Sequence, residues 1–196
     1  MSTDTVTREE LHHRDVDLRF FRRSDGFFEV EGRLVDTKTH SFRRLLAEED
    51  ALPGQHLHDI TVRLVLDAEL QVHAAEANMS ATPFSICPGA ETALQALVGL
   101  SIGAGWNKRV RELLGGVVSC THIVELLGPM ATTVLQGIGP LRITSTDDPE
   151  ADAQRRFRVD SCYAFAAERE VVIRLLPRRR CEKPDTSIQP SPLTNS

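Results

Sequence analysis

The feature that most constrains the fold of this chain is a period of two in three consecutive segments, residues 26–38, 58–67 and 70–78. In each segment apolar side chains alternate with polar ones, which predicts β-strands with one face in a core and the other toward water. The last residue of the second segment, Asp67, forms with Ala68 and Glu69 a short connection to the third segment, as in a three-residue hairpin loop. We therefore predict a three-stranded antiparallel meander.

The hairpin also predicts which residues of its two strands face each other, because a slip by one residue would turn one apolar face outward. Matching the apolar faces places Leu66 opposite Leu70 and Ile60 opposite Glu76. His58 then lies diagonally next to Glu76, on the core side at one end of the sheet. We interpret His58 as a candidate general base and Glu76 as the carboxylate that orients its imidazole.

Beyond residue 81 the apolar residues recur at helical spacing, which predicts about three helices packed on the sheet. The helical segments are residues 91–102, 107–116 and 123–135. Ser119 or Thr121 is the expected cap of the third helix, and Gly128-Pro129 predicts a kink or break inside it. The expected fold class is therefore α+β, a small antiparallel sheet packed against these helices.

The two ends of the chain differ in character from its middle. Residues 1–17 are polar and are expected to be a flexible lead-in, and residues 178–196, basic and then rich in Pro, Ser and Thr, are expected to be a disordered tail. Residues 18–177 suffice for a single α+β domain. Within them, residues 155–165 and 170–177 fit either a closing hairpin that extends the sheet or a helix followed by a strand.

Charge and composition exclude several classes of partner. A formal net charge of -5 and an isoelectric point near 5.8 disfavour nucleic acid and anionic membranes, and an aromatic content of 5% disfavours a base-stacking platform. No run approaches the roughly 18 apolar residues that cross a bilayer, and no signal peptide is present, so a cytoplasmic location is expected. The expected partner is a small-molecule substrate, with no nucleic acid and no membrane. A homo-oligomer is possible, but no segment indicates one.

In a reducing compartment the four cysteines are candidate ligands, nucleophiles or core residues rather than disulfide partners: Cys87, Cys120, Cys162 and Cys181. Cys120 and His122 fall at the start of the third predicted helix, where free amides and the helix dipole would stabilise a thiolate. A separation of two on a helix points His122 away from Cys120, so a self-contained nucleophilic pair is not expected. Cys87 precedes the first predicted helix, so both helix starts can approach the sheet end that carries His58.

These converging residues fit two kinds of site. As a soft-metal site, Cys87, Cys120, His122 and His58 would bind a zinc or iron ion. Without a metal, His58, Glu76, Cys120 and His122 would instead carry acid–base chemistry. A third alternative also stays open, in which each of these residues only packs in the core.

Two further residues are candidate substrate contacts. Trp106, the one tryptophan, follows a glycine-rich turn and would line a pocket. Asp59 follows His58 and is expected to point off the opposite face of its strand. No nucleotide cofactor is expected, because the turn before Trp106 lacks the spacing of a phosphate-binding loop.

Several motifs, in order along the chain, resemble a bacterial domain-of-unknown-function family that reads R-R-x-D-G, H-D-M, a lone cysteine, G-W and G-C-T-H-L. The matching stretches are RRSDG at 22–26, HDI at 58–60, Cys87, GW at 105–106 and SCTHI at 119–123. The resemblance covers residues 19–177. This chain departs from the pattern at Ile60, Ser119 and Ile123, none of which removes a polar group from the candidate site. Members of that family resemble proteins of proteobacterial catabolic gene sets for aromatic and acyl compounds.

The order of elements is also similar to iron–sulfur scaffold proteins, which present cysteines, a histidine and an aspartate at one end of a small sheet. Cys87, Cys120 and His122 would match the ligands of such a protein, but this chain has no obvious middle cysteine and Thr121 separates Cys120 from His122. We expect a small enzyme with lyase-type acid–base chemistry on an aromatic or acyl catabolic metabolite. The alternative is a non-catalytic metal or iron–sulfur carrier or scaffold.

Overall fold

The computed structural model describes residues 6–142, 156 and 158–175. By its internal contacts the chain divides into two compact units, Met1–Gly139 and Pro140–Ser196, where the sequence predicts one domain over residues 18–177. The predicted disordered tail, residues 178–196, lies outside the described residues. The first unit contains the sheet and all of the candidate site.

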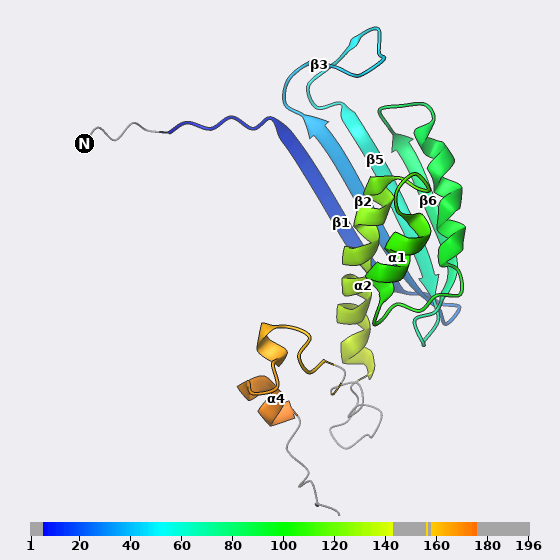
Figure 1. Cartoon of the computed structure of the whole chain (residues 1–196), viewed down its shortest axis with the longest axis vertical. Coiled ribbons are helices and arrows are strands. Elements are labelled where there is room, and N and C mark those ends of the chain that lie inside the picture. The colour runs from blue at the N-terminus through cyan, green and yellow to red at the C-terminus, as the bar shows by residue number, and fades with distance from the viewer. Residues whose placement is uncertain (1–5, 143–155, 157, 176–196) are drawn as a thin grey trace, which may run out of the picture. The chain divides into compact units, whose positions relative to one another are not determined.

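The first unit is built on a four-stranded antiparallel sheet with the strand order β1-β2-β5-β6 (Figure 1). Its strands are β1 (His12–Arg22), β2 (Phe28–Lys38), β5 (His56–Leu66) and β6 (Val72–Ala81). Two short strands, β3 (Phe42–Arg43) and β4 (Asp50–Ala51), pair with each other between β2 and β5. The predicted α+β class is confirmed, and the three predicted strands correspond to β2, β5 and β6.

The fourth strand comes from the N-terminal part of the chain, not from the C-terminal part. Residues 12–17, predicted to be a flexible lead-in, form the first half of β1. In the second unit the described residues include η2 (Tyr163–Phe165) and α4 (Glu170–Leu175), so the strand predicted over residues 170–177 is wrong. A short apolar segment of this length does not by itself distinguish a strand from a helix.

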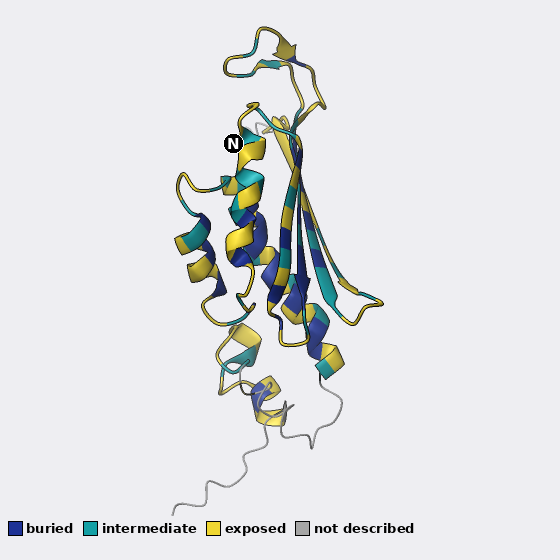
Figure 2. Cartoon of the chain, turned by 90° about the vertical axis from the view of Figure 1, so that its right-hand side faces the viewer, coloured by how far each residue is buried: buried dark blue, intermediate teal, exposed yellow. Residues whose placement is uncertain are grey.

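Three helices cover one face of the sheet, as predicted (Figures 1 and 2). They are η1 (Cys87–Leu97), a 3-10 helix, then α1 (Trp106–Leu114) and α2 (Thr121–Arg142). Figure 2 shows the buried residues gathered on the sides of the sheet and the helices that face each other. Among the described residues, no helix combines the length and the apolar character that crossing a membrane requires.

Helix α2 runs without interruption through Gly128 and Pro129, so of the kink or break that the sequence predicts, the break is wrong. Pro129 removes only one backbone donor from the helix. Leu126, Leu127 and Met130 are almost completely buried around this point. Their burial, at roughly 1.5–3 kcal/mol for each side chain, outweighs the loss of one helical hydrogen bond.

The start of α2 also differs from the prediction. The carbonyl of Cys120 accepts a hydrogen bond from the amide of Val124 (3.1 Å), which makes Cys120 the N-cap residue. Thr121, one of the two predicted caps, is already the first residue of the helix, and the hydroxyl of Ser119, the other, is buried without a hydrogen-bond partner. The side chain of Cys120 therefore precedes the first helical turn.

The turn between β5 and β6 is longer than the predicted three-residue loop. Asp67 Oδ1 accepts the amides of Glu69 (3.0 Å) and Gln71 (2.9 Å), a side-chain pattern that stabilises a turn. Leu70 adopts a left-handed backbone conformation (φ 64°) and its side chain is buried. Leu70 therefore belongs to the turn and packs into the core from there, and it does not begin the strand.

This longer turn changes the pairing of the two strands. Leu66 lies opposite Val72, and a register shift follows at once between Val65 and Leu66. Ile60 consequently faces Met79 and not Glu76, so the predicted register is wrong. Because neighbouring residues of a strand point to opposite faces, this change moves Glu76 to the face of the sheet away from the helices.

A close approach of α2 to the sheet depends on a glycine in β2. A Cβ atom built on Gly32 would lie 2.9 Å from Sδ of Met130 and 3.0 Å from Cδ2 of Leu18. Since the hydrogen of glycine avoids both contacts, the helix can pack closely against β1 and β2. The close approach of α2 to these strands therefore requires the absence of a side chain at Gly32.

We expect Gly32→Ala to lower the free energy of unfolding by about 1–3 kcal/mol, because overpacking forces Met130 and Leu18 out of their positions. Urea denaturation followed by circular dichroism measures this loss. Gly103→Ala is the matched control, since a Cβ there would meet no atom within 4 Å. Equal stability of the two variants would contradict the close approach.

Candidate functional site

Three ionisable residues from adjacent strands form a row at one end of the helix-facing side of the sheet. Arg14 of β1 lies opposite Asp36 of β2, and Asp36 lies opposite His58 of β5. Asp36 continues the face on which Val30 and Leu34 are buried, because alternate residues of a strand point to the same side. An acidic side chain thus extends the core face, with only 1% of its surface exposed.

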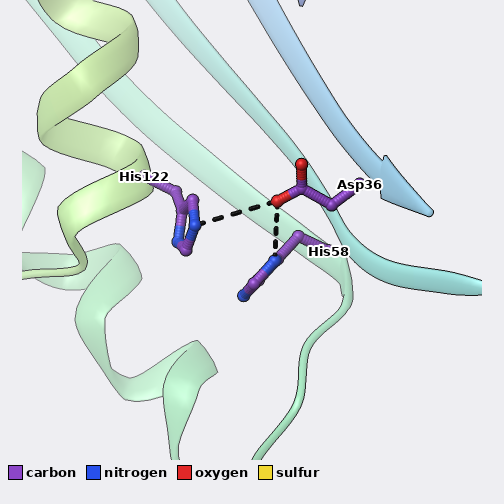
Figure 3. A group of neighbouring side chains, drawn as sticks. All are labelled: Asp36, His58 and His122. Carbon is purple, nitrogen blue, oxygen red and sulfur yellow. Dashed lines mark hydrogen bonds and ion pairs between the residues drawn. The ribbon is translucent and has the colours of Figure 1, made fainter. Parts of the chain in front are cut away.

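Hydrogen bonds reach both carboxylate oxygens of Asp36. Arg14 donates from Nε to Oδ1 (2.7 Å) and from Nη2 to Oδ2 (2.9 Å), the forked geometry that a guanidinium favours. Nδ1 of His58 lies 2.9 Å from Oδ2, and Nε2 of His12 lies 3.1 Å from Oδ1 (Figure 3 shows the contact of His58). These partners satisfy a carboxylate that would otherwise be costly to bury.

The charge state of Asp36 determines the tautomer of His58. Burial alone would raise the pKa of Asp36, but hydrogen bonding and charge from Arg14, with a further bond from His58, lower this pKa to about 2. An ionised carboxylate can only accept hydrogen bonds, so Nδ1 of His58 carries the hydrogen that they share. In the neutral ring, Nε2 of His58 then holds the free lone pair and can act as a base.

Helix α2 contributes two further residues to the site, Glu125 and His122. Nη1 of Arg14 donates to both carboxylate oxygens of Glu125 (2.8 and 3.0 Å), so one guanidinium joins the sheet to the helix. The ring of His122 lies against that of His58, with the centroids 3.9 Å apart and the planes tilted by 38°. Figure 3 shows Nε2 of His122 directed at the Asp36 oxygen that His58 contacts, at 3.8 Å.

The surroundings of His122 favour its neutral form. Burial is the main cause that lowers its pKa below the ordinary value, followed by the nearby His58 and Arg14, and these outweigh the opposite effect of Asp36. A neutral imidazole has one nitrogen that can accept a proton. His122 can therefore receive a proton or a hydrogen bond near neutral pH.

Cys120 and His122 lie together, contrary to the prediction. Sγ of Cys120 is 3.6 Å from Nδ1 of His122, within the range of a hydrogen bond that involves sulfur. The prediction assumed that both residues are helical, but Cys120 is the N-cap and its backbone lies outside the helix. A residue before the first turn can direct its side chain back over that turn, as N-cap side chains commonly do.

An open pocket of about 600 Å³ lies beside this cluster. His58, Cys87, Cys120 and His122 all contribute to its wall, so side chains from β5, η1 and the start of α2 meet there. The rest of the wall is mostly apolar and includes Phe84, Ile86, Val117 and Val118, all of them exposed. The pocket thus has ionisable groups on one part of its wall and an apolar, solvent-exposed remainder.

Three predicted site residues lie elsewhere. Glu76 faces Arg63 and forms an ion pair with it on the far side of the sheet, so its predicted place beside His58 is wrong. Trp106 is buried in the core, where its Nε1 donates to the carbonyl of Leu127 (3.0 Å), and it does not line the pocket.

Asp59, the third of these residues, points to the opposite face of its strand, as expected. There it accepts hydrogen bonds from Arg33 (2.9 and 2.8 Å) and lies 3.1 Å from Nδ1 of His56. Its side chain therefore stabilises the outer face of the sheet. A contact between Asp59 and a substrate in the pocket is not consistent with this position.

The predicted metal ligands reach the same pocket but do not form one closed set. Among the residues that the structure describes, Asp36, His58 and His122 are the group whose ligand atoms all lie within 4.8 Å of one another. Cys87 and Cys120 line the pocket without joining this group. The metal role of the four predicted residues stays a prediction.

Sequence reasoning missed Asp36, Arg14 and Glu125. The alternation of Val30 and Leu34 continues directly to Asp36, which is the sequence signal that its side chain lies on the core face. For Arg14 the signal was the alternation of apolar and charged residues in β1, within the supposed lead-in. Glu125 lies three residues after His122 on α2, which places the two on one helix face.

We predict that the stability contributed by Asp36 disappears at acid pH. Its folded pKa of about 2 is below the ordinary value of 3.8, so the contribution is complete above about pH 5 and is lost as the pH falls through 2. The shift corresponds to about 2 kcal/mol. In urea denaturation, the advantage of the wild type over Asp36→Asn should shrink by this amount over that range.

Asp50→Asn is the control for this measurement, because Asp50 forms an exposed pair with Arg43. Its effect on the free energy of unfolding should stay within about 0.5 kcal/mol. If Asp36→Asn were as mild as Asp50→Asn at neutral pH, the buried carboxylate would not have the role described here.

Comparison with known proteins places the chain in a family without adding an activity. Residues 12–136, from the first residue of β1 into α2, match the family described as "Protein of unknown function (DUF2889)". No curated protein and no solved structure matches the chain. The matched segment contains Asp36, His58, Cys120 and His122 and covers more than half of the sequence. The chain belongs to the DUF2889 family.

Proposed function

We propose that this protein is a small enzyme that removes a proton from an aromatic or acyl metabolite in a lyase-type reaction. His58 is the general base in this proposal. The observation that carries it is the 2.9 Å contact between Nδ1 of His58 and Oδ2 of the buried Asp36, at the wall of the pocket. A histidine oriented by a carboxylate beside a cavity is the usual arrangement of an imidazole base.

The surroundings of His58 support this role. The sequence predicts Glu76 as the carboxylate that orients His58, and in this proposal Asp36 has that role instead. Its ionised carboxylate orients the His58 ring and stabilises the imidazolium that forms on proton transfer. Arg14 is a positioning residue, because it holds Asp36 through both oxygens. His122 lies against the ring of His58 at the pocket wall, and its surroundings favour the neutral form, so it adds no second positive charge beside the base.

The pocket wall supports an aromatic or acyl substrate. Phe84, Ile86, Val117 and Val118 offer apolar surface, while the ionisable groups are restricted to one part of the wall. A substrate with an apolar body and one carbonyl or carboxylate group would match this division. The reacting carbon would then lie near Nε2 of His58.

Metal or iron–sulfur binding is the second candidate, and the cluster of Asp36, His58 and His122 is the observation that favours it. Two features of the cluster make it secondary. Arg14 already occupies both oxygens of Asp36 and brings a positive charge to the position that a cation would need. His58 also uses Nδ1 to donate to Asp36, so only its Nε2 is free for coordination.

We expect the wild-type protein in deuterated water to exchange the protons next to the carbonyl of at least one member of a panel of aryl-substituted and short-chain 3-hydroxy and 3-oxo acids. Proton NMR follows the exchange. His58→Gln should slow it by about 100-fold or more, because a positioned base contributes that much. His73→Gln is the matched control, since His73 also pairs with an aspartate (Asp67, 2.7 Å) but does not line the pocket.

Exchange that is equally fast in His58→Gln and the wild type would contradict the proposal. The metal alternative is separated by elemental analysis of protein purified without a histidine tag. One zinc or iron ion per chain that is lost in His122→Ala would favour the carrier. Exchange that persists after treatment with a chelator would favour the metal-free base.

A further inference from the structure

We propose that Cys120 and His122 form a nucleophilic pair that accepts an acyl group from an activated ester or thioester, and that the acyl–Cys120 thioester is then hydrolysed. This activity goes beyond the proton transfer proposed above, although it uses the same pocket. It would make the protein a thiol-dependent acyl hydrolase. The geometry of three residues, Cys120, His122 and Asp36, supports it.

The three residues are arranged in the order that a thiol nucleophile requires. Sγ of Cys120 lies 3.6 Å from Nδ1 of His122, and Nε2 of the same ring lies 3.8 Å from Oδ2 of Asp36. With the ring hydrogen on Nε2, toward the carboxylate, Nδ1 is free to take the proton of the thiol. The carboxylate then stabilises the imidazolium, as the third member of a catalytic triad does.

Access to the sulfur is provided by the pocket. Cys120 and His122 both line it and both are only partly buried, so an acyl compound can reach Sγ from solvent. Ile86 and Val117 are exposed on the same wall and offer apolar surface to the acyl chain. Of the two described cysteines that line the pocket, Cys120 is the one paired with a histidine.

The first half-reaction forms the thioester. The Sγ–H proton moves to Nδ1 of His122, and the sulfur electron pair forms a bond to the carbonyl carbon of the substrate. The bond from this carbon to the leaving alcohol or thiol breaks, and the leaving group takes the proton from His122. Because Cys120 is the N-cap of α2, the first-turn amides of the helix lie nearby as donors for the oxyanion.

The second half-reaction returns the free enzyme. Nε2 of His58 removes a proton from water as the water oxygen attacks the thioester carbon, and the carbon–sulfur bond breaks. The proton then passes to Sγ of Cys120, and the products are a carboxylic acid and the thiol. The rings of His58 and His122 are in close contact, with 3.9 Å between their centroids. Both bases can therefore act on one acyl group bound to Cys120.

The test uses p-nitrophenyl butyrate with the full-length chain. We expect the wild type to release p-nitrophenolate catalytically, and His58→Gln to release one equivalent rapidly and then turn over about 100-fold more slowly. Peptide mass spectrometry of His58→Gln should locate one butyryl group on Cys120. In His122→Gln the rapid phase should slow by about 100-fold, and in Cys120→Ala it should be absent.

Cys162→Ala is the control, because Cys162 is an exposed free thiol that would react first if exposure alone decided reactivity. It should behave as the wild type does. Absence of a butyryl group on Cys120 in both the wild type and His58→Gln, or its presence on Cys162 instead, would overturn the proposal. Since adduct mapping in these two proteins requires no substitution at Cys120, a folding defect in Cys120→Ala cannot decide the result. Proton exchange on the acid panel is measured separately, so failure of either activity leaves the other open to test.

Discussion

The buried carboxylate of Asp36 is the constraint on which the rest of the site depends. It is 1% exposed and remains ionised, because Arg14 donates to both of its oxygens and because His12 and His58 lie within hydrogen-bond distance of them. Charge-assisted bonds of this kind are worth about 1.5–3 kcal/mol each, whereas an unpaired buried carboxylate would cost several kcal/mol. The row Arg14–Asp36–His58 across three strands therefore has to form as a unit. Once it forms, the tautomer of His58 follows from the charge of Asp36.

Helix α2 connects this row to the pocket. Gly32 lets the helix lie close to β1 and β2, and Arg14 joins the helix to the sheet through Glu125. His122 is thereby placed against His58, and Cys120, the N-cap residue, contacts this pair through Nδ1 of His122. Two imidazoles thus share one oxygen of Asp36, one at 2.9 Å and the other at 3.8 Å. The proposed proton transfer depends on the first contact, and the proposed acyl transfer on the second.

Sequence reasoning could predict the fold class, three strands and the helical layer, because these follow from apolar periodicity alone. The register between β5 and β6 was not predictable, since it depends on Leu70 adopting a left-handed conformation and on Asp67 capping two amides of the turn. That error placed Glu76 beside His58 when the true partner is Asp36. The pairing of Cys120 with His122 was missed for a similar reason, because it depends on whether the helix begins before or after Cys120. The register between β5 and β6 and the starting residue of α2 each depend on the backbone conformation of a single residue. Apolar periodicity does not reveal such a conformation.

The central claim is that an ionised Asp36 holds His58 with its hydrogen on Nδ1 and its lone pair on Nε2. Long-range proton–nitrogen correlation NMR of the uniformly labelled protein reports the tautomer of each histidine ring directly. For the neutral ring of His58, assigned by its loss in His58→Gln, the account predicts the Nδ1-protonated tautomer in the wild type. It also predicts a shift toward the Nε2-protonated tautomer in Asp36→Asn, where the amide no longer requires a donor. A wild-type His58 with its hydrogen on Nε2 would contradict the account.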